Sequence, residues 1–407
     1  SRDMRGQKYV LQVAPEDCTG CNLCVEVCPA KDRQNPEIKA INMMSRLEHV
    51  EEEKINYDFF LNLPEIDRST SQLITPLFEY SGACSGCGET PYIKLLTQLY
   101  GDRMLIANAT GCSSIYGGNL PSTPYTTDAN GRGPAWANSL FEDNAEFGLG
   151  FRLTVDQHRV RVLRLLDQFA DKIPAELLTA LKSDATPEVR REQVAALRQQ
   201  LNDVAEAHEL LRDADALVEK SIWLIGGDGW AYDIGFGGLD HVLSLTENVN
   251  ILVLDTQCYS NTGGQASKAT PLGAVTKFGE HGKRKARKDL GVSMMMYGHV
   301  YVAQISLGAQ LNQTVKAIQE AEAYPGPSLI IAYSPCEEHG YDLALSHDQM
   351  RQLTATGFWP LYRFDPRRAD EGKLPLALDS RPPSDALAET LLQEQRFRRL
   401  NAQQPEV

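Results

Sequence analysis

The sequence contains no uninterrupted apolar run approaching eighteen residues, so no membrane-spanning helix is expected. Its first residues, Ser1-Arg2-Asp3-Met4, form no apolar stretch, and we expect no secretory signal peptide. Basic residues are not in excess either: the formal net charge is −14, which argues against general nucleic-acid binding. No internal repeat is visible. Together these absences predict a cytoplasmic protein with neither nucleic-acid nor membrane partners.

The nine cysteines lack the distribution of a secreted disulfide framework. Four lie at positions 18, 21, 24 and 28, two lie at 84 and 87, and three stand alone at 112, 258 and 336. Clustering at two-residue gaps without a secretory signal indicates a reducing compartment and metal ligation.

The 407 residues are enough for two or three domains. We interpret residues 1–45 as a small Cys-rich segment, 46–75 as a linker and 365–407 as a carboxy-terminal tail that wraps a surface or frays. Over 76–364, buried apolar runs alternate with helical patterns, which predicts an α/β domain with a doubly wound, mostly parallel sheet. Within it, apolar residues at helical spacing amid many charges predict an inserted helical hairpin at about 153–220. The expected strands are Met104–Ala107, Ile222–Ile225, Val249–Leu254, Val300–Ile305 and Ser328–Tyr333, and Ala309–Ala323 is an expected helix.

A ferredoxin-like spacing, C-x2-C-x2-C-x3-C-P, is formed by Cys18, Cys21, Cys24, Cys28 and Pro29. Two-residue gaps let three thiolates converge on one cubane, and the fourth cysteine usually reaches the other cluster of a two-cluster module. The run predicts a partial ferredoxin-like α+β segment; a zinc site, the alternative, normally has two pairs a dozen or more residues apart. No second run precedes Cys18, so the fourth ligand is expected from Cys28 folding back, from a partner chain or from a segment upstream of a fragment.

Two polar loops follow two of the expected strands. Gly227-Asp228-Gly229-Trp230 comes after Ile222–Ile225, and the loop Asp255–Gly264 comes after Val249–Leu254. Paired loops of this kind are how thiamine enzymes hold a diphosphate. Mg²⁺ prefers oxygen ligands and bridges phosphate oxygens, and Asp228 and Thr256 would offer such oxygens across one crevice. The glycines let backbone N–H groups approach the phosphates.

With these motifs the sequence resembles the pyruvate:ferredoxin (flavodoxin) oxidoreductase family from Cys18 to about Tyr333. Four family motifs are unbroken: Cys84-Ser-Gly-Cys87-Gly-Glu89, Thr110-Gly-Cys112-Ser, Gly227-Asp-Gly-Trp-Ala-Tyr-Asp-Ile-Gly235 and Tyr259-Ser-Asn-Thr-Gly-Gly264. On their own, the cysteines at 84, 87 and 112 could be buried thiols or a zinc site. The resemblance implies the carboxy-terminal part of such an enzyme, in which a ferredoxin-like segment precedes a domain with the thiamine diphosphate-binding fold.

The resemblance also implies the site residues. Cys84, Cys87, Cys112 and Cys336 are implied ligands of a 4Fe-4S cluster, and Asp228, Thr256 and the backbone carbonyl of Cys258 are implied ligands of Mg²⁺. Glu89 and Asn261 are implied catalytic residues, with Asn261 facing the 2-oxo acid. We expect no role for the Cys258 side chain, the alternative being a redox-active thiol. The residues implied to contact thiamine diphosphate are Glu89, Cys112, Gly227, Asp228, Gly229, Trp230, Thr256, Gln257, Cys258, Tyr259, Ser260 and Asn261.

The implied reaction is oxidative decarboxylation of pyruvate to acetyl-CoA and CO2, with single electrons passing through 4Fe-4S clusters to ferredoxin or flavodoxin. The resemblance implies further partners: coenzyme A, absent amino-terminal domains or a partner chain, and a second copy of the chain in a homodimer. Because the family's pyrimidine-binding and coenzyme A-binding motifs are missing, we expect the chain alone to turn over poorly. The alternatives are another 2-oxo acid, such as 2-oxoglutarate or a branched-chain acid, and an electron-transfer module without independent turnover. The basic run 283–288 is expected to be a solvated face, or else a docking site for an acidic carrier.

Overall fold

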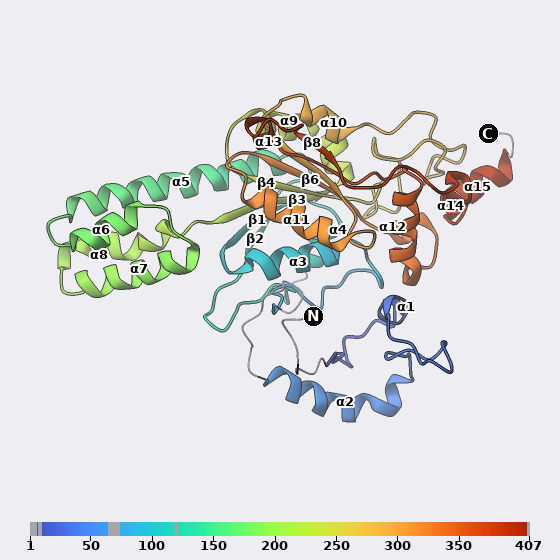
Figure 1. The fold of residues 1–407 in the computed structure, drawn as a ribbon, viewed down its shortest axis with the longest axis horizontal. Helices are drawn as coiled ribbons and strands as arrows, with labels where there is room; N and C mark the ends of the chain where they lie inside the picture. The colour runs from blue at the N-terminus through green and yellow to red at the C-terminus, as the bar shows by residue number, and fades with distance from the viewer. Residues whose placement is uncertain (1–5, 7–9, 64–73, 119–120, 405–407) are drawn as a thin grey trace.

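The computed structural model describes residues 6, 10–63, 74–118 and 121–404. Its centre is an eight-stranded sheet with the order β2-β1-β3-β4-β6-β5-β7-β8, in which the first six strands are mutually parallel and β7 pairs antiparallel with both β5 and β8 (Figure 1). The prediction of a mostly parallel sheet is confirmed. The strands are β1 Met104–Asn108, β2 Ala135–Asn138, β3 Ser221–Gly227, β4 Asn250–Asp255, β5 Tyr301–Ile305, β6 Ser328–Tyr333, β7 Tyr362–Phe364 and β8 Leu376–Leu378.

Helices cover both faces of the sheet, which makes the fold doubly wound. Successive residues of the central strands point to opposite faces, so Ile251 and Val253 of β4 enter one core while Leu252 and Leu254 enter the other. The first core is closed by α9 Phe236–Ser244, α10 Leu290–Met295 and α12 Ser346–Ala355. The second is closed by α3 Thr90–Tyr100, α4 Cys112–Gly117 and α11 Leu311–Glu322. Burial on both faces explains why these strands are apolar throughout.

The helical insertion is more elaborate than a hairpin. It contains α5 Asn144–Gln168, α6 Ala175–Lys182, α7 Pro187–Leu201 and α8 His208–Asp213, and it projects sideways from the sheet (Figure 1). Pro174 precedes α6 and Pro187 opens α7, where the Thr186 hydroxyl caps the helix, so the expected second arm is divided. The insertion has a core of its own, formed by Val162, Leu166, Ile173, Leu181, Val194, Leu197, Leu201, Ala207, Leu210, Ala214 and Leu217.

The two ends of the chain contain further helices. The Cys-rich segment holds α1 Leu23–Val27, and the stretch interpreted as a linker holds α2 Arg46–Leu61, which buries none of its residues; residues 64–73 of that stretch lie outside the described residues. In the tail, α13 Arg367–Asp370, α14 Leu387–Leu391 and α15 Gln395–Gln403 follow β7. Arg396, Phe397 and Leu400 of α15 are buried, so this end of the chain packs against the domain. No helix among the described residues is long and apolar enough to cross a membrane.

Candidate functional site

Three oxygen atoms meet where two neighbouring parallel strands end. Asp228 follows β3, Thr256 follows β4, and Thr256 Oγ1 lies 3.0 Å from Asp228 Oδ1 and 3.1 Å from the backbone oxygen of Cys258. Mg²⁺ binds oxygens at about 2.0–2.1 Å in octahedral geometry, which places adjacent ligand oxygens about 3 Å apart. The arrangement and the all-oxygen chemistry of this set therefore fit a small, hard cation.

Asp228 is completely buried. Burial, and then the negative charge of Asp255, raise the pKa of the Asp228 carboxyl to about 8, while hydrogen bonds from Ser267 and Thr256 act in the opposite direction. A bound cation would favour the carboxylate and lower this pKa. Ser267, whose hydroxyl donates to Asp228 Oδ2, was not among the expected site residues.

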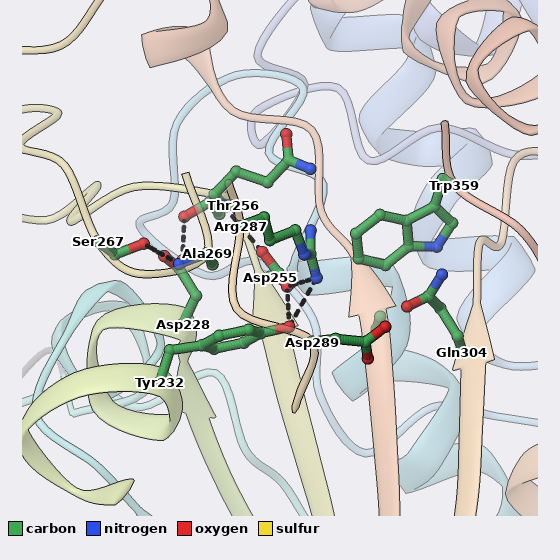
Figure 2. Close-up of polar contacts among 12 residues, drawn as sticks. Asp228, Tyr232, Asp255, Thr256, Ser267, Ala269, Arg287, Asp289, Gln304 and Trp359 are labelled. Carbon is green, nitrogen blue, oxygen red and sulfur yellow. Dashed lines mark hydrogen bonds and ion pairs between the residues drawn. The ribbon is translucent and has the colours of Figure 1, made fainter. Parts of the chain in front are cut away.

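A second buried acid, Asp255, is held by Arg287 near the Asp228–Thr256 pair (Figure 2). Arg287 Nη2 donates to Asp255 Oδ2 and to the Tyr232 hydroxyl, both at 2.6 Å, and Tyr232 donates to the same carboxylate oxygen at 2.8 Å. Arg287 belongs to the basic run 283–288, which was expected to be a solvated face or docking site. Within that run Arg284 and Lys285 are exposed, but Arg287 turns inward and Lys283 donates to the backbone oxygens of Ser267 and Thr270.

The loop after β4 depends on unusual backbone geometry. Gln257 has a φ of 60°, and its N–H donates to Asp255 Oδ1 at 3.0 Å. Gly263 and Gly264 have φ values of 97° and 85°, in the left-handed region that favours glycine. At Gly229 the constraint is steric, because a Cβ atom would meet the Tyr259 ring at 2.5 Å. At Gly227 a Cβ atom would meet only the Leu254 oxygen, at 3.8 Å, which leaves room for a ligand to approach this backbone.

The side chains of the two loops differ in their access to the site. Trp230 is fully buried and packs against Gly226 and Gly235, and Gln257 is fully buried with its Oε1 accepting from Arg396 at 2.6 Å. These two residues can therefore reach a cofactor only through their backbone atoms. Ser260 and Asn261, by contrast, line a cavity next to the three oxygens.

That cavity, of about 140 Å³, brings together cysteines from three separate parts of the sequence. Cys84, Cys87, Cys112 and Cys336 all line it, together with Glu89, Tyr116, Thr256, Ser260 and Asn261. Among the described residues, no group of three or more His, Cys, Asp or Glu side chains could hold a single metal ion. A cubane makes a different demand, because each of its four thiolates binds a different iron and the sulfurs stand further apart. Four cysteines around one small cavity fit that demand.

Burial raises the pKa values of ionisable groups that line the cavity. It raises the pKa of the Cys112 thiol to about 12 and that of Cys87 well above its usual range, so positive charge is needed to hold either as a thiolate. Burial also raises the pKa of Glu89 to about 7, although a hydrogen bond donated by the Tyr116 hydroxyl at 3.0 Å acts to lower it. The Cys258 side chain, which was expected to have no role, lies beside the thiol of Cys336, and this interaction is the largest cause of the raised pKa of Cys336.

Three of the four ferredoxin-like cysteines have interacting thiols, whereas the fourth makes a separate contact. The neighbouring thiols of Cys21 and Cys18 contribute, after burial, to a raised pKa of Cys24, whereas the Cys28 thiol donates to the backbone oxygen of Ala30 at 3.7 Å. The segment lies against the cavity wall: α1 contacts the turn Leu343–Leu345, and Ser85 Oγ, between Cys84 and Cys87, lies 3.2 Å from Thr19 Oγ1.

Comparison with known proteins places both parts of the chain. Residues 207–332 match the family model of the thiamine pyrophosphate enzyme, C-terminal TPP binding domain, and residues 11–31 match the 4Fe-4S binding domain. The chain thus joins a thiamine diphosphate-binding domain to an iron–sulfur segment, which confirms the prediction of these two cofactors.

Individual relatives indicate a more specific family than the two domain models do. The chain is 97% identical over its whole length to a probable pyruvate-flavodoxin oxidoreductase of Escherichia coli (strain K12) and 55% identical over 99% of its length to a putative one of Synechocystis. It is 49% identical over its whole length to the pyruvate:ferredoxin oxidoreductase of Moorella thermoacetica. It spans 35%, 35% and 36% of these three proteins. The chain belongs to the pyruvate:ferredoxin (flavodoxin) oxidoreductase family and covers about a third of the length of these members.

Proposed function

We propose that the chain is the cofactor-binding and electron-transfer part of an enzyme that converts pyruvate and coenzyme A to acetyl-CoA and CO2 and reduces flavodoxin or ferredoxin. The observation that carries this proposal is the position of the Asp228–Thr256–Cys258 oxygens beside a cavity lined by four cysteines. A thiamine site adjoining an iron–sulfur site can oxidise a 2-oxo acid by single electrons. The names of the relatives support pyruvate as the acid.

In this proposal Asp228, Thr256 and the Cys258 carbonyl hold Mg²⁺, and the backbone at Gly227 and Gly229 approaches the diphosphate. Bound thiamine diphosphate supplies the nucleophilic carbon and the electron sink that decarboxylation requires. Cys84, Cys87, Cys112 and Cys336 hold a 4Fe-4S cluster next to the substrate. Cys18, Cys21, Cys24 and Cys28 serve the ferredoxin-like segment, which leads electrons outward.

Two side chains of the cavity act on the substrate. Asn261 is exposed at its rim, and its amide donates a hydrogen bond to the 2-oxo acid. Glu89 is buried with a pKa of about 7, so it can hold or release a proton at its carboxyl near neutral pH. The contact between Ser85 and Thr19 keeps the two cysteine segments adjacent, as electron transfer between their clusters requires.

The decisive experiment is anaerobic reduction of a viologen dye by the intact oxidoreductase. We expect reduction that requires pyruvate, coenzyme A, thiamine diphosphate and Mg²⁺, and that is lost in Asp228→Asn. Reduction that persists in Asp228→Asn would refute the cation site, and preference for 2-oxoglutarate over pyruvate would refute the substrate. Because the chain spans about a third of its relatives, we expect the isolated chain to turn over poorly; full pyruvate-dependent activity of this chain alone would contradict that expectation.

A further inference from the structure

A partly buried, positively charged side chain, that of Arg287, lies near the proposed cation-site oxygens. The guanidinium of Arg287 lies 4.5 Å from the centroid of the Trp359 ring and 5.4 Å from that of Tyr232. Its Nη2 atom donates to Asp255 Oδ2 and to the Tyr232 hydroxyl, which itself donates to Asp255 Oδ2 (Figure 2). Arg287 and Tyr232 thus form a closed triangle of hydrogen bonds with one oxygen of an acid whose side chain is completely buried.

The other oxygen of that acid fixes the backbone of the cation loop. Asp255 Oδ1 accepts the N–H of Gln257 at 3.0 Å, and Gln257 has a φ of 60°. A non-glycine residue in this region requires support from its surroundings. Thr256 and Cys258, on either side of Gln257, carry two of the three oxygens proposed to hold the cation. The conformation of Gln257 therefore sets the directions of both.

We propose that Arg287 is a positioning residue of the cation site: by clamping Asp255 with Tyr232, it holds the turn at Gln257 that presents the Thr256 and Cys258 oxygens to Asp228. This inference rests on the proposed thiamine diphosphate site. Arg287 touches neither the cation oxygens nor the cavity, and it acts only through Asp255.

An argument from charge alone predicts tighter cation binding when Arg287 is replaced, whereas the positioning role predicts weaker binding. Removing a positive charge near a cation site strengthens the attraction between the remaining carboxylates and the cation. Loss of positioning weakens binding instead, and removal of an outer residue that orients metal ligands typically costs about 10–100-fold in metal affinity. The sign of the change in affinity therefore distinguishes the two effects.

The experiment measures Mn²⁺ binding to the intact protein in the presence of thiamine diphosphate, from the room-temperature EPR signal of free Mn²⁺. Mn²⁺ accepts the same oxygen ligands as Mg²⁺. For Arg287→Gln we expect a Mn²⁺ dissociation constant raised by about 10–100-fold. The matched control is Arg284→Gln, which removes the same charge from an exposed position of the same loop, and we expect its dissociation constant to equal that of the wild type.

A double variant tests the route through Asp255. Asp255→Asn combined with Arg287→Gln keeps an oxygen that can accept the Gln257 N–H but leaves no charge that needs a partner. We expect it to recover most of the affinity lost in Arg287→Gln. A purely structural role would lower the stability of Arg287→Gln without changing the affinity of the folded protein, and that result would overturn the inference.

The remaining outcomes are also decisive. Wild-type protein that binds no Mn²⁺ with thiamine diphosphate would defeat the proposed function itself, whereas wild-type binding with equal or tighter binding in Arg287→Gln would defeat only this inference. If Arg287→Gln does not fold, Arg287→Lys takes its place, because it keeps the charge while one ammonium cannot bridge two acceptors and stack as a guanidinium does. Weaker Mn²⁺ binding in Arg287→Lys supports the inference, and unchanged binding overturns it.

Discussion

Thr256 Oγ1 and Asp228 Oδ1 lie 3.0 Å apart and join the ends of β3 and β4. The two residues are 28 positions apart in the sequence and meet because parallel neighbours in a sheet end at the same edge. The contact brings a buried carboxylate and a hydroxyl together, and the Cys258 carbonyl lies beside the same hydroxyl; these are the three oxygens proposed to hold a cation. It also makes the proposed cation site sensitive to small changes in either strand.

Asp228→Asn should abolish cation-dependent cofactor binding without unfolding the domain, because the side chain keeps its size but loses its charge. We expect the Mg²⁺-dependent affinity for thiamine diphosphate to fall by at least about 100-fold, beyond the usual effect of an outer residue. Isothermal titration calorimetry measures this directly. Asp203→Asn, at an exposed position of the helical insertion, is the control and should bind as the wild type does. Equal affinity in the two variants would show that Asp228 is no ligand.

Gly229→Ala should disturb the same site by steric contact. The added methyl group would stand 2.5 Å from the Tyr259 ring, so the loop after β4 must shift. We expect thiamine diphosphate binding to weaken by about tenfold or more, as small misplacements of binding groups do. Gly237→Ala in α9 is the control, since its methyl group would meet nothing within 4 Å. Binding that weakens equally in both variants would contradict the steric explanation.

The sheet could be predicted from sequence wherever strands are buried on both faces. Ile251, Leu252, Val253 and Leu254 form an unbroken apolar run, which is why β4 was found. The edge strands β2 and β8, and β7 next to β8, are not predicted because they have three or four residues and are partly exposed. Short edge strands carry no periodic signal that separates them from loops.

Within the candidate site, local motifs identified the residues of the two loops, but not those that support them. Arg287 lies 32 positions from Asp255, and Arg396 lies 139 positions from the Gln257 that it contacts. No local pattern links such pairs. The one available signal is the basic run 283–288, and its charges suggest a surface because sequence alone does not show that Arg287 packs against Trp359 and Tyr232.

Replacement of a cavity cysteine should remove one cluster and leave the other. For Cys336→Ala we expect about four fewer iron atoms and four fewer sulfides per chain than in the wild type, because a 4Fe-4S cluster needs four thiolates. Colorimetric iron and sulfide assays after anaerobic purification test this. The matched control is Cys258→Ala, whose thiol contacts that of Cys336 but whose proposed role uses the backbone carbonyl. Iron content that falls in Cys258→Ala and not in Cys336→Ala would reverse the assignment.

The buried Glu89 carboxyl should make stability depend on pH. Its pKa is raised from 4.5 to about 7, so the folded protein keeps a proton that the unfolded chain releases near pH 4.5. Stability therefore falls as pH rises through this window. Between pH 5 and 7 we expect the wild type to lose about 2 kcal/mol relative to Glu89→Gln, from 1.36 kcal/mol per pKa unit. Parallel urea unfolding at the two pH values measures the difference. In Tyr116→Phe, which lacks the hydroxyl that favours the carboxylate, the decline should extend to higher pH.

Arg396 in α15 should contribute to stability far more than its place near the end of the chain suggests. Its Nε lies 2.6 Å from Glu394 Oε2, and the two side chains are 4% and 0% exposed. Removing one partner of a buried ion pair leaves an uncompensated charge and costs about 3–5 kcal/mol, so we expect Arg396→Met to lower the free energy of unfolding by this amount. Arg399→Met, at an exposed position of the same helix, should have little effect.

The partner variant separates charge from packing. Glu394→Gln combined with Arg396→Met removes both charges and should recover much of the lost stability, since a buried pair can be replaced by neutral groups at little cost. Arg396 also donates to Gln257 Oε1 at 2.6 Å, so even a double variant that recovers stability should bind thiamine diphosphate more weakly than the wild type. Unfolding by urea and calorimetric binding measure the two effects separately. Full recovery of binding would show that α15 stabilises the domain without acting on the loop after β4.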